Sequence, residues 1–207
     1  MKKLLILLFS LFFLSSPSVF ADSISDFEIE GMSIGDSLLD YMTEDEILEE
    51  IEITKNSYLH LNEPYKYAEV YLWKDFPTYD SVTVKLENIS SSKYVGNKNE
   101  KYTILSVRGL IDYNEDFDSC LQKRDEIAAD LSKVFINADK WESISASPSD
   151  PSGNSILDGI WFNFDSGDSA SIYCNNWEET FRNKNNLSEG LTVSIKSGEI
   201  SKWLSDY

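Results

Sequence analysis

The chain has 207 residues, with 18 Lys or Arg against 36 Asp or Glu, and its formal net charge is −18. Such a charge repels the phosphates of nucleic acids and the surface of anionic membranes, so the composition argues against both classes of partner. The length is sufficient for one domain with a substantial hydrophobic core, or for two small domains.

The first 21 residues have the pattern of a secretory signal peptide. Lys2 and Lys3 form a charged start, the apolar run 4–14 is too short to span a membrane, and Val19 and Ala21 lie at the positions that signal peptidase reads. We therefore expect cleavage after Ala21 and a product, 22–207, that is periplasmic or secreted. No later apolar run is long enough to insert this product into a membrane.

The first half of the exported chain predicts a short helix and a β-hairpin. Thr43 to Glu46 has the sequence of a capping box, in which the two side chains accept from each other's backbone N–H groups at a helix start. Apolar and polar residues then alternate over 65–74 and again over 81–87, with a turn at 75–80 that contains Pro77. This alternation predicts two strands, and the turn between them predicts an antiparallel hairpin.

The segment 101–135 predicts the centre of the fold. Residues 103–113 are apolar on both faces of a strand, which is typical of a strand in the interior of a sheet. From about Asp116, apolar residues recur at spacings of three and four, which predicts the longest amphipathic helix of the chain.

The second half predicts a loop, a second hairpin, and a final strand and helix. Residues 143–155 are rich in Ser, Pro, Asp and Gly, and we interpret them as an irregular loop and as the best candidate for an internal domain boundary. Strands are predicted at 159–164, 169–174 and 191–196, and a short helix at 199–207. The order favours one α+β domain, 22–207, with an antiparallel sheet and helices packed on one face. The two halves look like loosely repeated units of helix followed by strands.

The chain has two cysteines, Cys120 and Cys174. Cys120 falls on the apolar stripe of the predicted long helix, and Cys174 shares a strand face with Ala170 and Ile172, so both should point into the core. Because exported proteins meet an oxidising environment, we predict a Cys120–Cys174 disulfide. The alternative is a pair of buried free thiols.

Four residues at every second position offer oxygen ligands: Asp112, Asn114, Asp116 and Asp118. This spacing is that of the first ligands in an EF-hand loop. The match then fails, because the sixth position is Phe117 instead of Gly and the twelfth is Lys123 instead of Glu. We therefore interpret the segment as an acidic turn that caps a helix, keep a calcium-stabilised domain as an alternative, and expect no cofactor.

Aromatic residues provide the other candidate site. Tyr67, Tyr71 and Trp73 share one face of a predicted strand, and Trp161 lies on the face of its own strand opposite Phe162. If these faces are open they form a binding surface, since Tyr and Trp are enriched at protein contacts. The alternative is that a helix covers them.

The sequence contains no recognisable catalytic motif. His60 is the only histidine, and there is no Gly-x-Ser-x-Gly elbow, Gly-rich phosphate loop, zinc motif or dinucleotide fingerprint. We therefore predict a non-enzymatic binding or interaction module of the cell envelope, whose partner is another envelope protein or a small ligand. A carboxylate-dependent enzyme is the alternative, because 36 acidic residues create carboxylate pairs by chance.

Two stretches resemble known proteins. Residues 27–41, with the Cys120 helix and the closing segment 193–204, resemble a group of short uncharacterised exported proteins from marine alphaproteobacteria of the Pelagibacter type. The shared motifs are structural, so this resemblance implies no activity. Residues 31–39 are also similar to the opening helices of the β-lactamase-inhibitor-protein and SmpA-like fold, although this chain lacks the lipoprotein cysteine of the SmpA-like group.

Overall fold

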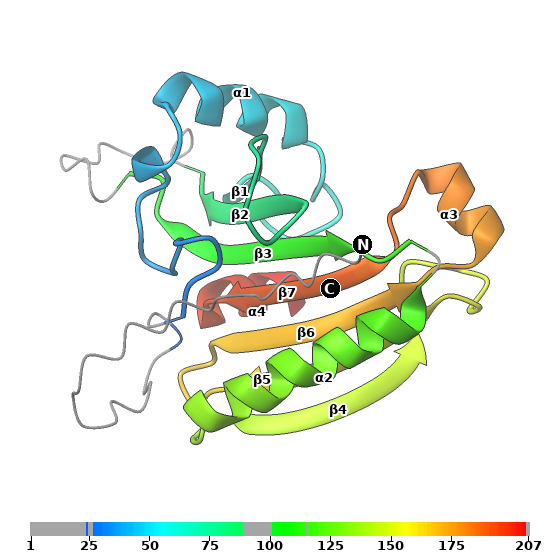
Figure 1. Cartoon of the computed structure of the whole chain (residues 1–207). Helices are drawn as coiled ribbons and strands as arrows, with labels where there is room; N and C mark the ends of the chain where they lie inside the picture. The colour runs from blue at the N-terminus through cyan, green and yellow to red at the C-terminus, as the bar shows by residue number, and fades with distance from the viewer. Residues whose placement is uncertain (1–23, 25–26, 89–100, 115, 206–207) are drawn as a thin grey trace, which may run out of the picture.

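The structure is a computed structural model that describes residues 24, 27–88, 101–114 and 116–205; the expected signal peptide, 1–21, lies outside the described residues. One antiparallel sheet organises the described chain. In spatial order its strands are β1 (Tyr67–Leu72), β2 (Ser81–Glu87), β3 (Ile104–Asp112), β7 (Gly190–Lys196), β6 (Ser169–Asn176), β5 (Ile156–Asn163) and β4 (Asp139–Ala146) (Figure 1). β3 is therefore an interior strand, as its two apolar faces predicted.

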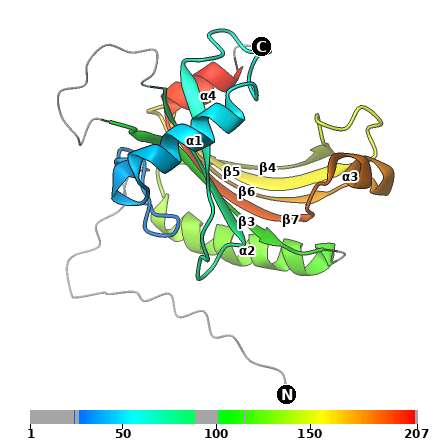
Figure 2. The ribbon, with the colours of Figure 1, turned by 90° about the horizontal axis from the view of Figure 1, so that it is seen from above.

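Helices lie on both faces of this sheet and along one edge. α2 (Phe117–Val134) crosses β5, β6 and β7 on one face, α4 (Gly198–Ser205) packs on the other, and α3 (Glu179–Asn185) stands near one end of the strands (Figures 1 and 2). A 3-10 helix (Leu38–Asp40) and α1 (Glu44–Thr54) precede β1. The predicted α+β class and antiparallel sheet are confirmed. The prediction that the helices pack on one face of the sheet is wrong for α4. Ile200 and Trp203 of this helix pack against Tyr67, on the face opposite α2.

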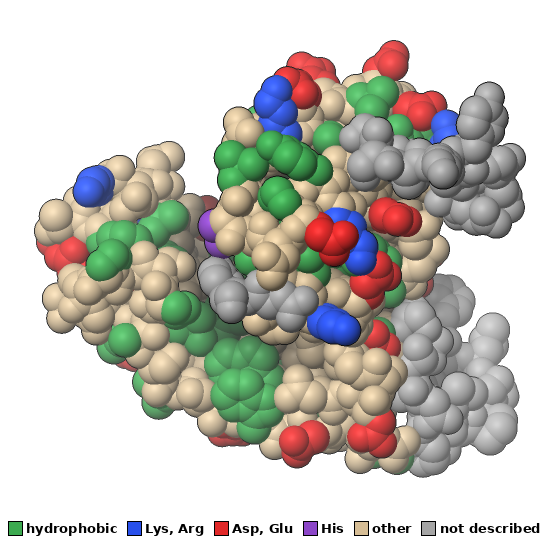
Figure 3. All heavy atoms as spheres, turned by 180° about the vertical axis from the view of Figure 1, so that it is seen from behind, with side chains coloured by type: hydrophobic (Ala, Val, Ile, Leu, Met, Phe, Trp, Pro, Cys, Tyr) green, Lys and Arg blue, Asp and Glu red, His purple; other side chains and the backbone are tan. Residues whose placement is uncertain are grey.

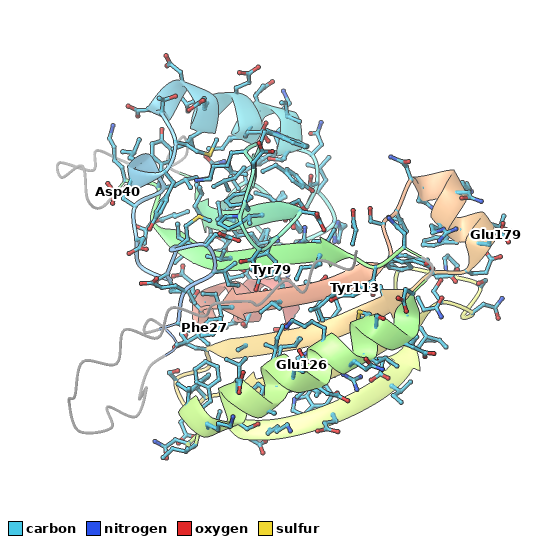
Figure 4. The ribbon with its side chains drawn as sticks, viewed as in Figure 1. Phe27, Asp40, Tyr79, Tyr113, Glu126 and Glu179 are labelled. Carbon is cyan, nitrogen blue, oxygen red and sulfur yellow. A yellow bond between two sulfur atoms is a disulfide. The ribbon has the colours of Figure 1, made fainter. Side chains whose placement is uncertain are left out.

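The face beneath α2 carries the main hydrophobic core. Residues in register across the sheet form an apolar row: Val70, Val84, Val107, Ile195, Ala170 and Phe162. Cys120 and Cys174 form the predicted disulfide, with Cα atoms 6.1 Å apart, and it ties α2 to β6. Beyond the C-terminal end of α2, the ring of Phe27 meets that of Phe135 edge-on at 5.7 Å, so the N-terminal lead-in covers the core there (Figure 4).

α1 closes the outer edge of β1. The helix begins at the predicted capping box, in which Thr43 and Glu46 exchange hydrogen bonds. Farther along, the Thr54 hydroxyl donates to the backbone carbonyl of Glu69 (2.6 Å), and the Glu50 carboxylate accepts from the backbone N–H of Tyr71 (3.4 Å). Such backbone groups on an edge strand otherwise invite pairing with another chain. Side chains of α1 therefore protect this edge.

β4 forms the opposite edge, and no other described strand pairs with its outer side. Its residues 143–146 lie in the segment that the sequence predicts as a loop, and that prediction is wrong for them. They pair with β5 from Ser143 opposite Gly159 to Ala146 opposite Ile156. Seven of the eight residues of β4 are exposed, so the strand has no apolar face by which its sequence could reveal it.

Candidate functional site

The face opposite α2, here called the polar face, is lined mainly by hydrophilic residues of the central strands. Residues in register across an antiparallel sheet share a face. One row across β1, β2, β3 and β7 consists of Glu69, Lys85, Ser106 and Lys196, and the next consists of Tyr71, Thr83, Arg108 and Ser194. Figure 2 shows α3 and α4 standing on this side of the sheet, toward opposite ends of the strands.

Glu69 is the only carboxylate in these two rows, and both of its oxygens accept hydrogen bonds. It accepts hydrogen bonds from Lys85 Nζ at 2.5 Å, Tyr58 Oη at 2.6 Å and Tyr71 Oη at 3.1 Å. Burial alone would raise the pKa of Glu69, but the charge and hydrogen bond of Lys85, with the hydrogen bond of Tyr58, lower this pKa to about 2. Glu69 is therefore ionised at neutral pH.

Lys85, Arg108 and Lys196 form a group of neighbouring cations that we call the cation cluster. Among these three, only Lys85 forms a direct ion pair, with Glu69, in the described structure. The charge of Glu69 also acts on Arg108, so Lys85 and Arg108 share this one nearby carboxylate. Burial, followed by the charges of Lys85 and Arg108, lowers the pKa of Lys196 to about 8. Burial also lowers the pKa of Lys85. The cluster therefore carries excess positive charge within a chain whose net charge is −18.

Arg108 lines a groove of about 530 Å³ on the polar face, a volume typical of small-molecule sites. Strands form its floor, α3 and the turn after it form one wall, and the segment 147–149 forms another. The lining residues are Tyr71, Ser81, Thr83, Arg108, Leu110, Ser147, Pro148, Ser149, Leu157, Tyr173, Asn175, Trp177, Phe181, Asn185, Asn186, Leu187, Ser188 and Thr192. Figure 3 looks onto this face and shows a hollow, bordered by hydrophobic side chains, between the α3 lobe and the rest of the molecule.

Arg108 is the only charged side chain among the described residues that line this groove. Opposite it in the β3–β7 pairing, the buried hydroxyl of Ser194 has no hydrogen-bond partner within the described structure. A guanidinium presents five N–H donors in a rigid fork, which matches the geometry of carboxylates and other oxyanions. The groove can therefore hold an anion, whereas a bound cation would meet only repulsion from Arg108.

The segment around α3 brings two aromatic side chains to the groove. Trp177 donates from Nε1 to a backbone carbonyl in the turn after α3 (3.0 Å), and its ring lies 5.9 Å from that of Phe181. The Glu178 carboxylate caps the helix by accepting from the backbone N–H of Phe181 at 2.7 Å. Arg182 pairs with Glu189 at 2.8 Å and thereby fastens α3 to the start of β7. These contacts fix the wall in place without a ligand.

Of the four aromatic residues predicted to form a binding surface, the structure places only Tyr71 in the groove. Tyr67 is buried beneath a tryptophan of α4. Trp73 lies beyond the end of β1, is 78% exposed, and stacks on Tyr71 at 5.7 Å. Trp161 lies farther along the polar face, where it stacks on Trp141 of β4 at 4.2 Å. The four residues share a side of the sheet but do not form one surface.

Sequence reasoning missed Arg108 as a site residue, and it missed the helix that forms the wall beside Trp177. A partial signal was present, because Thr83 and Thr192 each belong to a strand in which every second residue is hydrophilic, whereas the strand of Arg108 has Leu110 on the same face. That alternation marks one polar face once the neighbours of each strand are known.

The predicted capping role of the acidic segment around Asp116 is confirmed. Asp116 is the N-cap of α2 and accepts from the backbone N–H of Ser119 at 3.1 Å, and its hydrogen bonds with Ser119 lower the pKa of Asp116. Burial, and then the charge of Asp80, raises the pKa of Asp112. Over the described ranges, no group of three or more His, Cys, Asp or Glu side chains is placed to hold a metal ion.

Comparisons of the chain with protein-family models, with curated proteins and with solved structures find no match. In the part of the chain that the structure describes, no helix has the combination of length and apolarity needed to cross a bilayer. Function must therefore be inferred from the groove and the cation cluster themselves.

Proposed function

We propose that the protein is an exported, non-enzymatic binding module of the cell envelope, and that it holds a small anionic molecule in the groove. The observation that carries this proposal is Arg108, the only charged side chain that lines the groove in the described structure. It has no direct ion pair of its own there, and the nearby carboxylate that acts on it, Glu69, is already paired with Lys85. Arginine binds oxyanions through paired, charge-assisted hydrogen bonds, which are stronger and more directional than neutral ones.

A bound anion would also offset the excess charge of the cation cluster. The pKa of Lys196 is low because its ammonium group is buried beside Lys85 and Arg108. An anion at Arg108 favours the charged form of Lys196, so ligand binding and protonation of this amine are coupled. The affinity for an anion should therefore fall as the pH rises through the Lys196 pKa of about 8.

The rest of the groove suits an uncharged remainder of the ligand. Trp177, Phe181 and Leu157 offer apolar contact, and Thr83 and Asn175 offer hydrogen bonds. No Asp, Glu, His or Cys side chain lines the groove in the described part of the chain. Most groups that act as general bases or nucleophiles are therefore missing from it, which favours binding over catalysis.

Export is part of the proposal. The Cys120–Cys174 disulfide is typical of proteins that reach an oxidising compartment, and it agrees with the signal-peptide pattern of residues 1–21. Fractionation of the producing cell with N-terminal sequencing tests this point. A product that begins at Asp22 supports export, whereas cytoplasmic protein that retains Met1 contradicts it.

Isothermal titration calorimetry with acetate, benzoate and sulfate tests the anion site. We expect at least one of these anions to bind, and Arg108→Gln to weaken that binding roughly ten- to hundredfold, the loss expected for hydrogen bonds to a charged group. Arg108→Lys keeps the charge but loses the paired donors, so its affinity should be intermediate. Lys133→Gln removes a positive charge from the exposed surface of α2 and should leave binding unchanged. Binding that persists in Arg108→Gln would contradict the proposal.

A further inference from the structure

β4 is an exposed edge strand that lacks the protection which α1 gives to β1. Its Trp141 and Ile144 side chains are 44% and 72% exposed. Its outer backbone groups face no strand partner among the described residues, and α2 packs over β5 to β7 without covering it (Figure 1). An open edge of this kind is a template for the addition of another strand.

We propose that the strand added at this edge is the β4 of a second copy of the chain, antiparallel to the first, with the two-fold axis at Trp141. The contact is isologous, as in most homodimers, and it joins the two sheets into one continuous sheet. This inference does not depend on what occupies the groove.

Charge complementarity selects this register. In a continuous antiparallel sheet, opposite residues share a face, so β4 can pair with its own copy only in registers that place some residue opposite itself. Registers centred on Lys140 or Glu142 bring like charges together, and those centred on Ser143 or Ile144 place Lys140 and Glu142 opposite uncharged residues. Within one chain Lys140 already pairs with Glu142 on the same face of the strand, at 3.1 Å. Centring on Trp141 places each Lys140 opposite the partner's Glu142 as well, so the two ion pairs join into one group of four alternating charges. Oppositely charged pairs across strands stabilise a sheet.

The same register extends the tryptophan stack on the polar face. Within one chain Trp141 lies 4.2 Å from Trp161, with their rings nearly parallel, and it remains 44% exposed. Placing the two Trp141 side chains opposite each other covers this exposed indole surface with another indole. The contact area is that of a single strand pair, which is small for an interface, so the dimer should be reversible and concentration-dependent.

Cysteine cross-linking tests the register. Both native cysteines are held in the disulfide, so an introduced cysteine is the only free thiol. In the proposed dimer the two 141 positions are directly opposite, within the Cα separation that a disulfide spans, and Trp141→Cys should form a covalent dimer under mild oxidation. Ser145→Cys is the control, because its two copies would be roughly 26 Å apart along the seam and should stay monomeric. Cross-linking of Ser145→Cys without that of Trp141→Cys overturns the proposal.

A charge swap tests the pairing without changing the tryptophan. Sedimentation velocity in physiological salt, from micromolar to millimolar protein, should show a reversible dimer. Lys140→Glu should raise its dissociation constant roughly tenfold or more, and the double variant Lys140→Glu/Glu142→Lys should restore it. Lys133→Glu makes the same charge change on α2 and should have no effect. The proposal is overturned if the protein stays monomeric throughout, or if Lys140→Glu leaves the dissociation constant of the dimer unchanged. A protein that stays monomeric would indicate that the β4 edge binds a strand of another protein.

Discussion

The ring of Tyr79 rests directly on Gly109: a Cβ atom added to the glycine would lie 2.4 Å from Cδ1 of the tyrosine. Tyr79 belongs to the turn between β1 and β2, and Gly109 lies in β3, so this contact fastens the turn to the sheet (Figure 4). The carboxylate of Glu30 holds the turn by accepting from the backbone N–H of Tyr79 at 3.2 Å. Burial, and then the charge of Glu30, raises the pKa of Tyr79 to about 12.

Gly109→Ala should lower the free energy of unfolding by about 1–3 kcal/mol, because the added methyl group overpacks a contact that has no room for it. Urea denaturation measures the loss. The matched control is the same substitution in a Tyr79→Ala background, where the ring is absent and the cost should nearly vanish. An equal cost in both backgrounds would mean that the ring is not the obstacle.

Lys196→Met should raise the free energy of unfolding at pH 7 by about 1–3 kcal/mol, because it removes a buried cation that lies beside two others. In the native protein the folded-state pKa of about 8 lies below the unfolded-state value of about 10.4. Between these values the unfolded chain binds more protons, so stability should rise with pH.

Denaturation curves at pH 7 and pH 10 measure both the gain in stability from Lys196→Met and the rise in stability with pH. The rise in stability that is due to Lys196 should be absent in Lys196→Met and present in Lys133→Met, whose side chain is exposed on α2. Destabilisation by Lys196→Met at pH 7 would show that the amine has a favourable partner.

Glu69→Gln should destabilise the fold by about 3–5 kcal/mol, because it leaves Lys85 buried without its carboxylate. The pKa of Glu69 is lowered to about 2 from an unfolded-state value of about 4.3. Its contribution is therefore complete above pH 4.3 and is lost as the pH falls toward 2.

Acid denaturation followed by circular dichroism measures this loss. The double variant Glu69→Gln/Lys85→Met removes the stranded charge as well, so it should recover much of the stability at neutral pH. If the double variant is no more stable than Glu69→Gln, the unpaired charge of Lys85 is not the cause of the destabilisation.

Loss of the Cys120–Cys174 disulfide should lower the free energy of unfolding by about 4 kcal/mol, since the bridge closes a loop with a sequence separation of 54. Comparing urea midpoints of oxidised protein and of Cys120→Ala/Cys174→Ala measures the effect. Reductant should destabilise the native protein and leave the double variant unchanged. Identical midpoints for both proteins in oxidising buffer would contradict the prediction.

Elements with a continuous buried apolar face were predictable from the sequence. The hairpin strands and the long helix follow this rule, and the predicted start at Asp116 is the N-cap of α2. Cys120 and Cys174 were predictable as a pair because each lies on a buried face. β4 and α3 were not, because seven of eight residues in β4 are exposed and α3 has no fully buried residue. Pattern reasoning detects burial, and these two elements have little of it.

The groove was less predictable than the fold. Tyr71 could be selected from the sequence as an aromatic residue on a predicted strand. Arg108 could not be recognised as a site residue, because only the pairing of strands shows which residues lie beside it. Its position between Thr83 and Ser194 depends on β3 pairing with β7, which brings together distant parts of the chain. A single sequence predicts which strands exist better than which strands are neighbours.

A dimer joined through β4 presents β1 at both of its ends. At each end the Thr54 hydroxyl and the Glu50 carboxylate already occupy backbone groups that an incoming strand would need. The outer edges of the joined sheet are therefore the two β1 strands, where α1 hinders the addition of further copies. At high protein concentration, association should therefore end at the dimer. Fibrils should not form, because their growth requires a new open edge after every addition.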